Sequence, residues 1–278
     1  MDLNWFQGII YGFVSGLMDI LPVSAQAHRV LLLKLFGTRG SSDLLHLMLH
    51  FALVCALYFS CSGHVVRMSR ARQLSRIPKR KRKRPLDVKS LMDLSMMKTM
   101  LVPVILGMLL YPYTRKLHSG LLVSALFLFL NGVILYVPQF FPTGNRDSRN
   151  LSRVEGLLIG LGGMASVLPG ISAMGAATSI GSVCGVDRSY NLDMALLMNM
   201  FVNVGFLIHE ALDIAAGGLG TLTFMIILQY LVYAVSAFAA ALLGVRLMRR
   251  MADNGGYSMI GLYCFGMALF MFFLNLIA

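Results

Sequence analysis

The sequence predicts an all-α polytopic membrane protein, with about six transmembrane helices and two further helical hairpins that enter the bilayer without crossing it. Hydrophobic residues make up 57% of the 278 residues and charged residues 13%, whereas soluble domains average about 45–50% and about 25%. The apolar residues also fall into runs near the ~20 residues that a membrane-crossing helix needs. These observations exclude an ordinary soluble enzyme, a disordered protein and a disulfide-rich secreted domain.

Six runs are long enough and continuous enough to cross a bilayer as single helices. They cover residues 44–65, 91–113, 119–139, 190–213, 220–244 and 257–277. Two other apolar stretches, 5–36 and 154–185, are interrupted by polar turns at 21–28 (LPVSAQAH) and 168–175 (LPGISAMG). Proline breaks the helical hydrogen-bond ladder, and non-helical backbone at membrane depth must lie within protein or beside a wet cavity. Both stretches are therefore predicted to be re-entrant hairpins.

The two interrupted stretches resemble each other. Aligned on their prolines, 16–22 (GLMDILP) falls on 163–169 (GMASVLP), and 23–25 (VSA) then falls on 171–173 (ISA). Three predicted spans separate the copies, so the second hairpin enters from the opposite face, as in transporters built from inverted repeats. We expect one membrane domain over residues 1–278, with halves of about 1–139 and 140–278.

The net charge of +12 is concentrated in one segment. Eleven of the 24 Lys and Arg residues lie between Arg67 and Lys89, within a predicted basic loop 66–90. Because this loop joins two apolar spans, the positive-inside rule makes it cytoplasmic rather than a nucleic-acid patch. Both termini then lie outside, and the loop can contact membrane lipids with anionic headgroups. We expect no nucleic-acid partner.

The first break gathers ionisable and polar side chains within eleven residues: Asp19, Ser24, Gln26, His28 and Arg29. Ionisable residues at membrane depth are costly and mark functional sites. His28 and Arg29 begin the returning half-helix, whose N-terminal amides and dipole favour an anion. The second break adds Ser172 and small residues whose backbone amides can close around an oxygen-rich group. Together they predict a phosphate-sized anion site inside the membrane.

The segments 12–28 (GFVSGLMDILPVSAQAH) and 168–175, with the order of the spans, resemble the bacterial undecaprenyl-diphosphate phosphatases, also called bacitracin-resistance proteins. The resemblance implies an outward-facing site in the bacterial cytoplasmic membrane. It also implies removal of one phosphate from undecaprenyl diphosphate, a carrier lipid of cell-wall synthesis, and assistance from Mg²⁺ or Ca²⁺. A polyprenyl phosphate or diphosphate is the expected partner, and a homodimer is left open.

The two breaks and the resemblance together assign roles to particular residues. The expected catalytic residues are Asp19, Ser24, His28, Arg29 and Ser172. The expected substrate-binding residues are Ser15, Gln26, Gly170, Ala173, Gly175 and His50, although Ser15 also suits close helix packing. No metal ligand is assigned.

Several positions depart from the family pattern. Ser15 replaces one of two glutamates and Asp19 shortens the other, Ala25 replaces a serine, and Ala173 replaces an arginine. One arginine can be worth 10³ or more in phosphoryl transfer. We therefore expect a lipid binder or translocator with weak or lost phosphatase activity. The alternative is an active phosphatase in which Arg29 and Ser24 substitute for the lost groups, and a weaker alternative is a transporter for an unrelated anion.

Two other pairs lie one helical turn apart. His46 and His50 have a spacing that can hold a metal, but no third ligand is apparent, so hydrogen-bonded membrane histidines are expected. Asn199 and Asn203 are expected to make interhelical hydrogen bonds. Glu210 and its neighbours His209 and Asp213 are expected at a solvated helix end.

Overall fold

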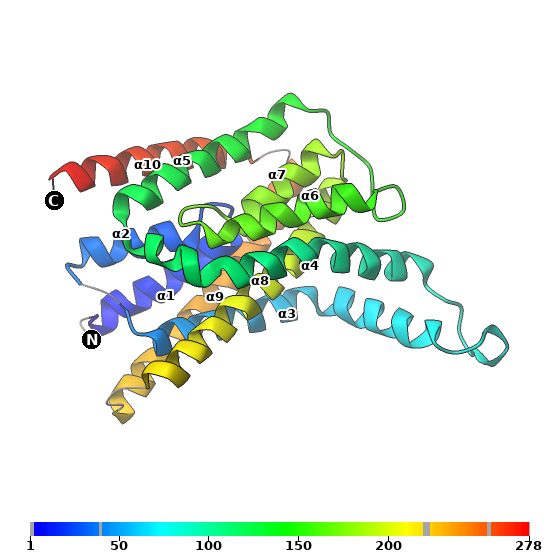
Figure 1. Ribbon diagram of the computed structural model, residues 1–278, viewed down its shortest axis with the longest axis horizontal. Helices are drawn as coiled ribbons and strands as arrows, with labels where there is room; N and C mark the ends of the chain where they lie inside the picture. Colours follow the sequence, from blue (N-terminus) through cyan, green and yellow to red (C-terminus); the bar gives the residue numbers. More distant parts are fainter. Residues whose placement is uncertain (1–2, 39–40, 219–222, 255–256, 278) are drawn as a thin grey trace.

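The computed structural model describes residues 3–38, 41–218, 223–254 and 257–277, which are helical with short connections and contain no strand (Figure 1). Six of the helices are long and apolar enough to cross a membrane. The prediction of an all-α polytopic membrane protein is therefore confirmed.

The helices follow the predicted order, with a hairpin before three spans in each half. The first five are α1 (Trp5–Ile20), α2 (Ala25–Leu35), α3 (Asp43–Ser75), α4 (Val88–Thr114) and α5 (Leu121–Tyr136). The others are α6 (Arg153–Met164), α7 (Ala173–Val183), α8 (Arg188–Gly217), α9 (Phe224–Asn254) and α10 (Ser258–Ile277). Short 3₁₀ segments lie at Lys79–Lys81, Arg115–Ser119, Val137–Phe140 and Ala165–Val167.

Two helices extend beyond the predicted spans. The predicted loop 66–90 is wrong in its first part, because α3 continues as helix to Ser75. The helix α9 likewise continues past residue 244 and carries Arg246, Arg249 and Arg250. An apolar run shows only which part of a helix can lie in the lipid. Arg, Leu, Met and Gln are strong helix formers in water too, so a helix can continue beyond the apolar run.

Each predicted hairpin consists of two helices joined by a short break. The α1–α2 break covers residues 21–24, and Ser24 there has a φ of 61°, a conformation that costs energy in a residue with a side chain. The α6–α7 hairpin breaks at 168–172. Figure 1 shows the two hairpins pointing toward each other from opposite ends of the molecule. That each returns to its own face of a bilayer stays a prediction.

The helices pack in a reciprocal pattern. α1 packs on α9 and α6 on α4, while α5 packs on α10 and α3 on α8. The first two contacts use the same device: a Cβ at Gly16 would lie 2.0 Å from the carbonyl oxygen of Ala237, and one at Gly160 would lie 2.2 Å from that of Met100. Small residues that let backbones approach are typical of helix packing in membranes.

The basic segment and the two chain ends lie at opposite ends of the molecule. Figure 1 shows the start of α1 and the end of α10 at one end, and the connection between α3 and α4 at the other. This arrangement suits the predicted topology, in which both termini are outside. The absolute orientation stays a prediction.

Candidate functional site

A cavity of about 390 Å³ lies between the first hairpin, the tip of the second hairpin and helices α3 and α8. Its volume falls within the ~300–1,000 Å³ common for small-molecule sites. Polar side chains line it, among them Asp19, Ser24, Gln26, Arg29, Lys34, Ser41, Asp43, His46, His50, Arg115, Ser166, Ser172, Asn199 and Glu210. Charged side chains therefore gather around a cavity between largely apolar helices.

The tips of the two hairpins are joined by one buried side chain of α5, Asn131. Its amide nitrogen donates to the Pro22 carbonyl at 2.8 Å, and its oxygen accepts from the Ser172 amide at 3.0 Å. Asn131 is fully buried, so both bonds form away from water. The sequence analysis missed this residue.

Asp19 is fixed at the cavity wall by α8. The amide groups of Asn199 and Asn203 both donate to its Oδ2, at 2.9 and 3.0 Å. Asp19 and Asn199 line the cavity, so the carboxylate is held in one orientation there. The prediction that the two asparagines make interhelical hydrogen bonds is confirmed, and their partner is the predicted Asp19.

The same network orients His50. Since the Asn203 amide nitrogen donates to Asp19, its Oδ1 is the acceptor of the 2.9 Å bond to Nδ1 of His50. Nδ1 therefore carries the proton, and the lone pair of a neutral His50 lies on Nε2. That Nε2 lies 3.5 Å from the Arg29 guanidinium, which also lies 3.3 Å from Nδ1 of His46. The other nitrogen of His46 bonds the Ser41 hydroxyl.

Glu210 completes a cluster with these histidines. One ligand atom each of His46, His50 and Glu210 lie within 4.8 Å of one another. Glu210 is only 8% exposed and lines the cavity, so its expected place at a solvated helix end was wrong. Asn199, Asn203 and Glu210 are spaced by whole helical turns on the inward side of α8. This periodicity in the sequence could have predicted that Glu210 faces the interior with the two asparagines.

Ser24 and His28 lie side by side but are not bonded through the serine hydroxyl. Nδ1 of His28 bonds the Ser24 carbonyl at 2.8 Å, and Nε2 bonds the Tyr263 hydroxyl at 2.8 Å. The Ser24 hydroxyl accepts instead from the Ala27 amide at 3.4 Å, capping α2. His28 is buried and stacks on Tyr263, and it does not belong to the cavity lining among the described residues.

The other predicted site residues divide into two groups. Gln26, Ala173 and Ser172 line the cavity, and the Ser172 hydroxyl caps α7 at the Gly175 amide. Gly170, Gly175 and Ser15 are not among the described residues that line the cavity. Gly170 has a φ of 93°, the Gly175 Cα faces Pro22 of the opposite tip, and Ser15 is buried with its hydroxyl unbonded.

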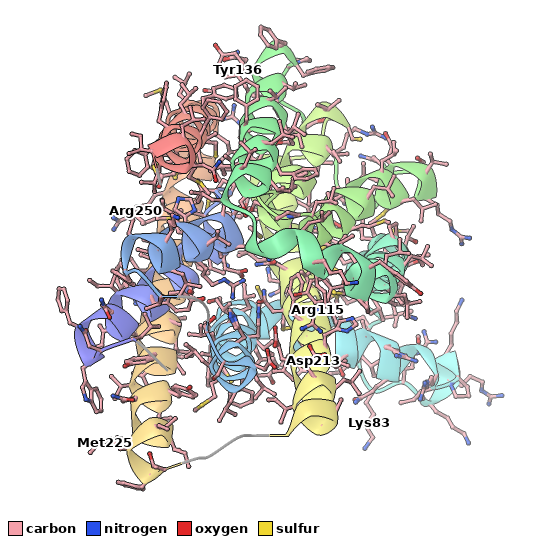
Figure 2. The ribbon with its side chains drawn as sticks, turned by 60° about the vertical axis from the view of Figure 1, so that its left-hand side comes forward. Lys83, Arg115, Tyr136, Asp213, Met225 and Arg250 are labelled. Carbon is pink, nitrogen blue, oxygen red and sulfur yellow. The ribbon has the colours of Figure 1, made fainter. Side chains whose placement is uncertain are left out.

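One further cation lies at the rim. Arg115 lines the cavity and forms a 2.5 Å ion pair with Asp213 of α8 (Figure 2). Its partner and its position at the cavity account for a cation at this end of the molecule.

The cavity is a poor match for the Mg²⁺ or Ca²⁺ that the resemblance implies. Both ions prefer oxygen ligands. Oδ2 of Asp19 faces two amide N–H groups, and the Glu210 carboxylate lies beside two imidazoles. Asp19 therefore offers a hard cation an oxygen that is already engaged, and Glu210 offers one among nitrogen ligands.

Comparison with known proteins identifies the family. The model of the family described as "Bacitracin resistance protein BacA" matches residues 8–270, which include both hairpins and nearly all of the spans. The chain belongs to the BacA family.

Proteins named as undecaprenyl-diphosphatases are similar over nearly their whole length. One from Methanobrevibacter smithii is 28% identical and the alignment covers 98% of this chain and 97% of the relative. "Undecaprenyl-diphosphatase 1" of Shouchella clausii is 22% identical over 97% and 96% of the two chains. One from Desulforapulum autotrophicum is 25% identical over 96% and 97%. The similarity therefore extends over nearly the whole of this chain and of each of these relatives.

Proposed function

We propose that this BacA-family protein binds a polyprenyl phosphate or diphosphate carrier lipid in the cavity, and that it hydrolyses the diphosphate weakly or not at all. The relatives' name supports the ligand class. The headgroup lies at the meeting hairpin tips, and the prenyl tail extends into the bilayer. The cavity is reached from the outer face, and the bound lipid is recognised or translocated there.

Cationic and hydroxyl groups in the cavity support binding of a phosphate. Arg29 contributes a guanidinium that can donate two parallel hydrogen bonds to phosphate oxygens. Lys34 and Arg115 add positive charge, and Ser24 and Ser172 add hydroxyl groups. Arg29 is the central group, because Arg115 is already paired with Asp213.

The observation that carries weak hydrolysis is the arrangement of Ser24 and His28. A serine nucleophile needs a base within hydrogen-bond reach of its hydroxyl. Nδ1 of His28 is directed to the Ser24 carbonyl, and Nε2 is engaged by Tyr263. The pair therefore has the geometry of a structural support for the hairpin tip.

The residues at the cavity wall support the same conclusion. Ala25 and Ala173 line the cavity, at positions where the resemblance implies a serine and an arginine. A methyl group neither donates a hydrogen bond nor balances the charge of a phosphoryl group in its transition state.

The second candidate is an active phosphatase, which one observation favours. Asp19 and Arg29 line the same cavity, and Asp19 is held by two amides. A fixed carboxylate and a guanidinium are groups that can position an attacking nucleophile and balance phosphoryl charge. Mg²⁺ or Ca²⁺ assistance belongs to this candidate.

The test is a paired measurement on the purified protein in detergent. Phosphate release from undecaprenyl diphosphate is measured with Mg²⁺, with Ca²⁺ and with a chelator, and binding of undecaprenyl phosphate is measured in parallel. We expect saturable binding that Arg29→Ala weakens at least tenfold, with turnover at least 10³-fold below that of a relative with intact motifs. Turnover equal to that of the relative would establish the second candidate.

A gain-of-function variant distinguishes two explanations of low turnover, namely the loss of catalytic residues and damage to the purified protein. Ala25→Ser combined with Ala173→Arg restores the hydroxyl and the guanidinium. We expect turnover to rise at least tenfold while binding stays saturable. Turnover that stays at the level of the unmodified chain, with binding retained, would contradict the assignment of these two positions.

A further inference from the structure

The cluster of His46, His50 and Glu210 is not explained by the proposed lipid site. The two histidines lie one turn apart on α3, and Glu210 comes from α8, which packs against α3. A carboxylate repels a phosphate, so Glu210 does not suit an anion subsite. Glu210 is buried, with 8% of the residue exposed, and one of its carboxylate oxygens lies within 4.8 Å of a ring nitrogen of each histidine.

The hydrogen bonds around the cluster direct lone pairs inward. The proton on Nδ1 of His50 is donated to Asn203, so its Nε2 faces the cluster as an acceptor. The Arg29 guanidinium can only donate, so Nδ1 of His46 faces the cluster as the second acceptor, and Nε2 carries the ring proton toward the Ser41 hydroxyl. Metal-bound histidines are typically held in this way, with the distal nitrogen donating to an oxygen.

A cation therefore suits the centre of the cluster, and a protein cation now lies there. Nη1 of Arg29 is 3.3 Å from Nδ1 of His46 and 3.5 Å from Nε2 of His50. These are long, weak contacts for a guanidinium. Arg29 lies on the short helix α2, and its side chain is long enough to swing away into the cavity that it also lines.

We propose that His46, His50 and Glu210 bind a transition-metal dication of the Zn²⁺ class, and that Arg29 and the metal ion compete for this position. Two imidazoles and one carboxylate match the preferences of Zn²⁺ and not those of Mg²⁺ or Ca²⁺. Three protein ligands also leave a fourth position for a water molecule or a phosphate oxygen. The site needs no lipid, so it stands independently of the proposed function.

The geometry needs only side-chain adjustment. Ligand atoms around a tetrahedral Zn²⁺ lie about 3.3 Å apart when metal–nitrogen bonds are about 2.0–2.1 Å long. The three ligand atoms are already within 4.8 Å of one another. Movements of about 1 Å bring them into range once Arg29 leaves.

The test is a Co²⁺ titration of the full chain, purified in detergent with a tag that contains no histidine. Tetrahedral Co²⁺ gives intense visible absorption, which Zn²⁺ then removes by displacement. We expect one equivalent of Co²⁺ to bind. His50→Ala and Glu210→Gln weaken binding at least tenfold. His64→Ala is the matched control, because His64 pairs with Asp193 away from the cavity, and its affinity stays within twofold.

Arg29→Ala is expected to have the opposite effect on Co²⁺ binding, and it therefore excludes misfolding as the explanation. If the guanidinium competes with the metal ion, its removal strengthens Co²⁺ binding at least tenfold, which an unfolded variant cannot do. Absence of the tetrahedral absorption, equal affinity of His50→Ala and the unmodified chain, or unchanged or weaker binding by Arg29→Ala would each overturn the proposal. Loss of binding in the His64→Ala control would overturn it as well.

Discussion

Single buried amides position the charged groups of this protein. Asn199 and Asn203 hold the Asp19 carboxylate, and Asn203 also sets the tautomer of His50. Asn131 bonds both hairpin tips. In the bilayer core, no water is present to form a hydrogen bond with an unpaired polar group. Each of these amides therefore bonds a defined partner and holds that partner in place.

Asn131→Leu is the first prediction at this scale. It leaves the Pro22 carbonyl and the Ser172 amide unpaired and buried, each at a cost of about 1–3 kcal/mol. We expect the melting temperature in detergent to fall by roughly 5–10 °C. Asn145→Ala, at an exposed loop position, serves as the control and is expected to leave the melting temperature unchanged. Equal melting temperatures for all three proteins would contradict the role assigned to Asn131.

The residue scale also shows how far the sequence can predict the site. Asp19 and Arg29 were predicted at the cavity because a charge near a helix break is costly and conspicuous. Asn131 and Glu210 were missed because each lies within a predicted span, and its partner depends on how that helix is rotated against others. His28 was predicted to be catalytic from motif order, which does not say that its ring turns toward Tyr263.

At the scale of elements, the connection between α5 and α6 is pinned by polar contacts. Arg146 pairs with Glu155 at 2.5 and 3.0 Å, and its backbone bridges to that of Val186 beyond α7. Glu155 also completes a capping box with Ser152 at the start of α6. These contacts fix where the second hairpin begins.

Glu155 supplies a pH-dependent prediction. Its hydrogen bonds with Arg146, then with Ser152, lower the pKa of the carboxyl group from 4.5 to about 2. A lowered folded-state pKa gives stabilisation that is complete above about pH 4.5 and is lost as the pH falls toward 2. We expect the unmodified chain to melt above Glu155→Gln from pH 7 to 5, with the gap closing between pH 4.5 and 2.

The partner variant Arg146→Met is the matched control. It removes most of the pKa shift while keeping the carboxylate, so its melting temperature declines less steeply over the same acidic range. A gap between the unmodified chain and Glu155→Gln that is still full at pH 2 would show that the pair is not responsible.

Helix limits were the least predictable part of the fold. Hydropathy located all six spans, because the apolar runs are long. It did not predict that α3 continues to Ser75 or α9 to Asn254. Whether a helix continues beyond the lipid depends on local helix propensity and packing. Hydropathy detects neither of these, so it does not predict where the helix ends.

On the scale of the whole molecule, the basic segment between α3 and α4 lies at one end of the long axis. The segment around Lys83 lies at one end, and Met225, at the start of α9, lies toward the other (Figures 1 and 2). If the basic end is cytoplasmic, Met225 faces outside.

Cysteine labelling checks this orientation. We expect Met225→Cys to react with a membrane-impermeant maleimide in intact bacterial cells, and Lys83→Cys to react only after permeabilisation. The unmodified chain is the control for its four native cysteines, of which Cys61 and Cys264 are buried and the others half-buried. The reverse labelling pattern would mean that the molecule is inserted the other way.

The bridge made by Asn131 limits how the proposed lipid can move. In an alternating-access cycle, one repeat rocks against the other while the substrate stays between them. Here Asn131 of the first half accepts a hydrogen bond from the Ser172 amide of the second half, so a rocking step that separates the halves must first break this buried bond, at a cost of about 1–3 kcal/mol. This hydrogen bond between the halves therefore favours a receptor that takes up and releases the headgroup on one side of the membrane. Any flipping of the lipid must begin by breaking it.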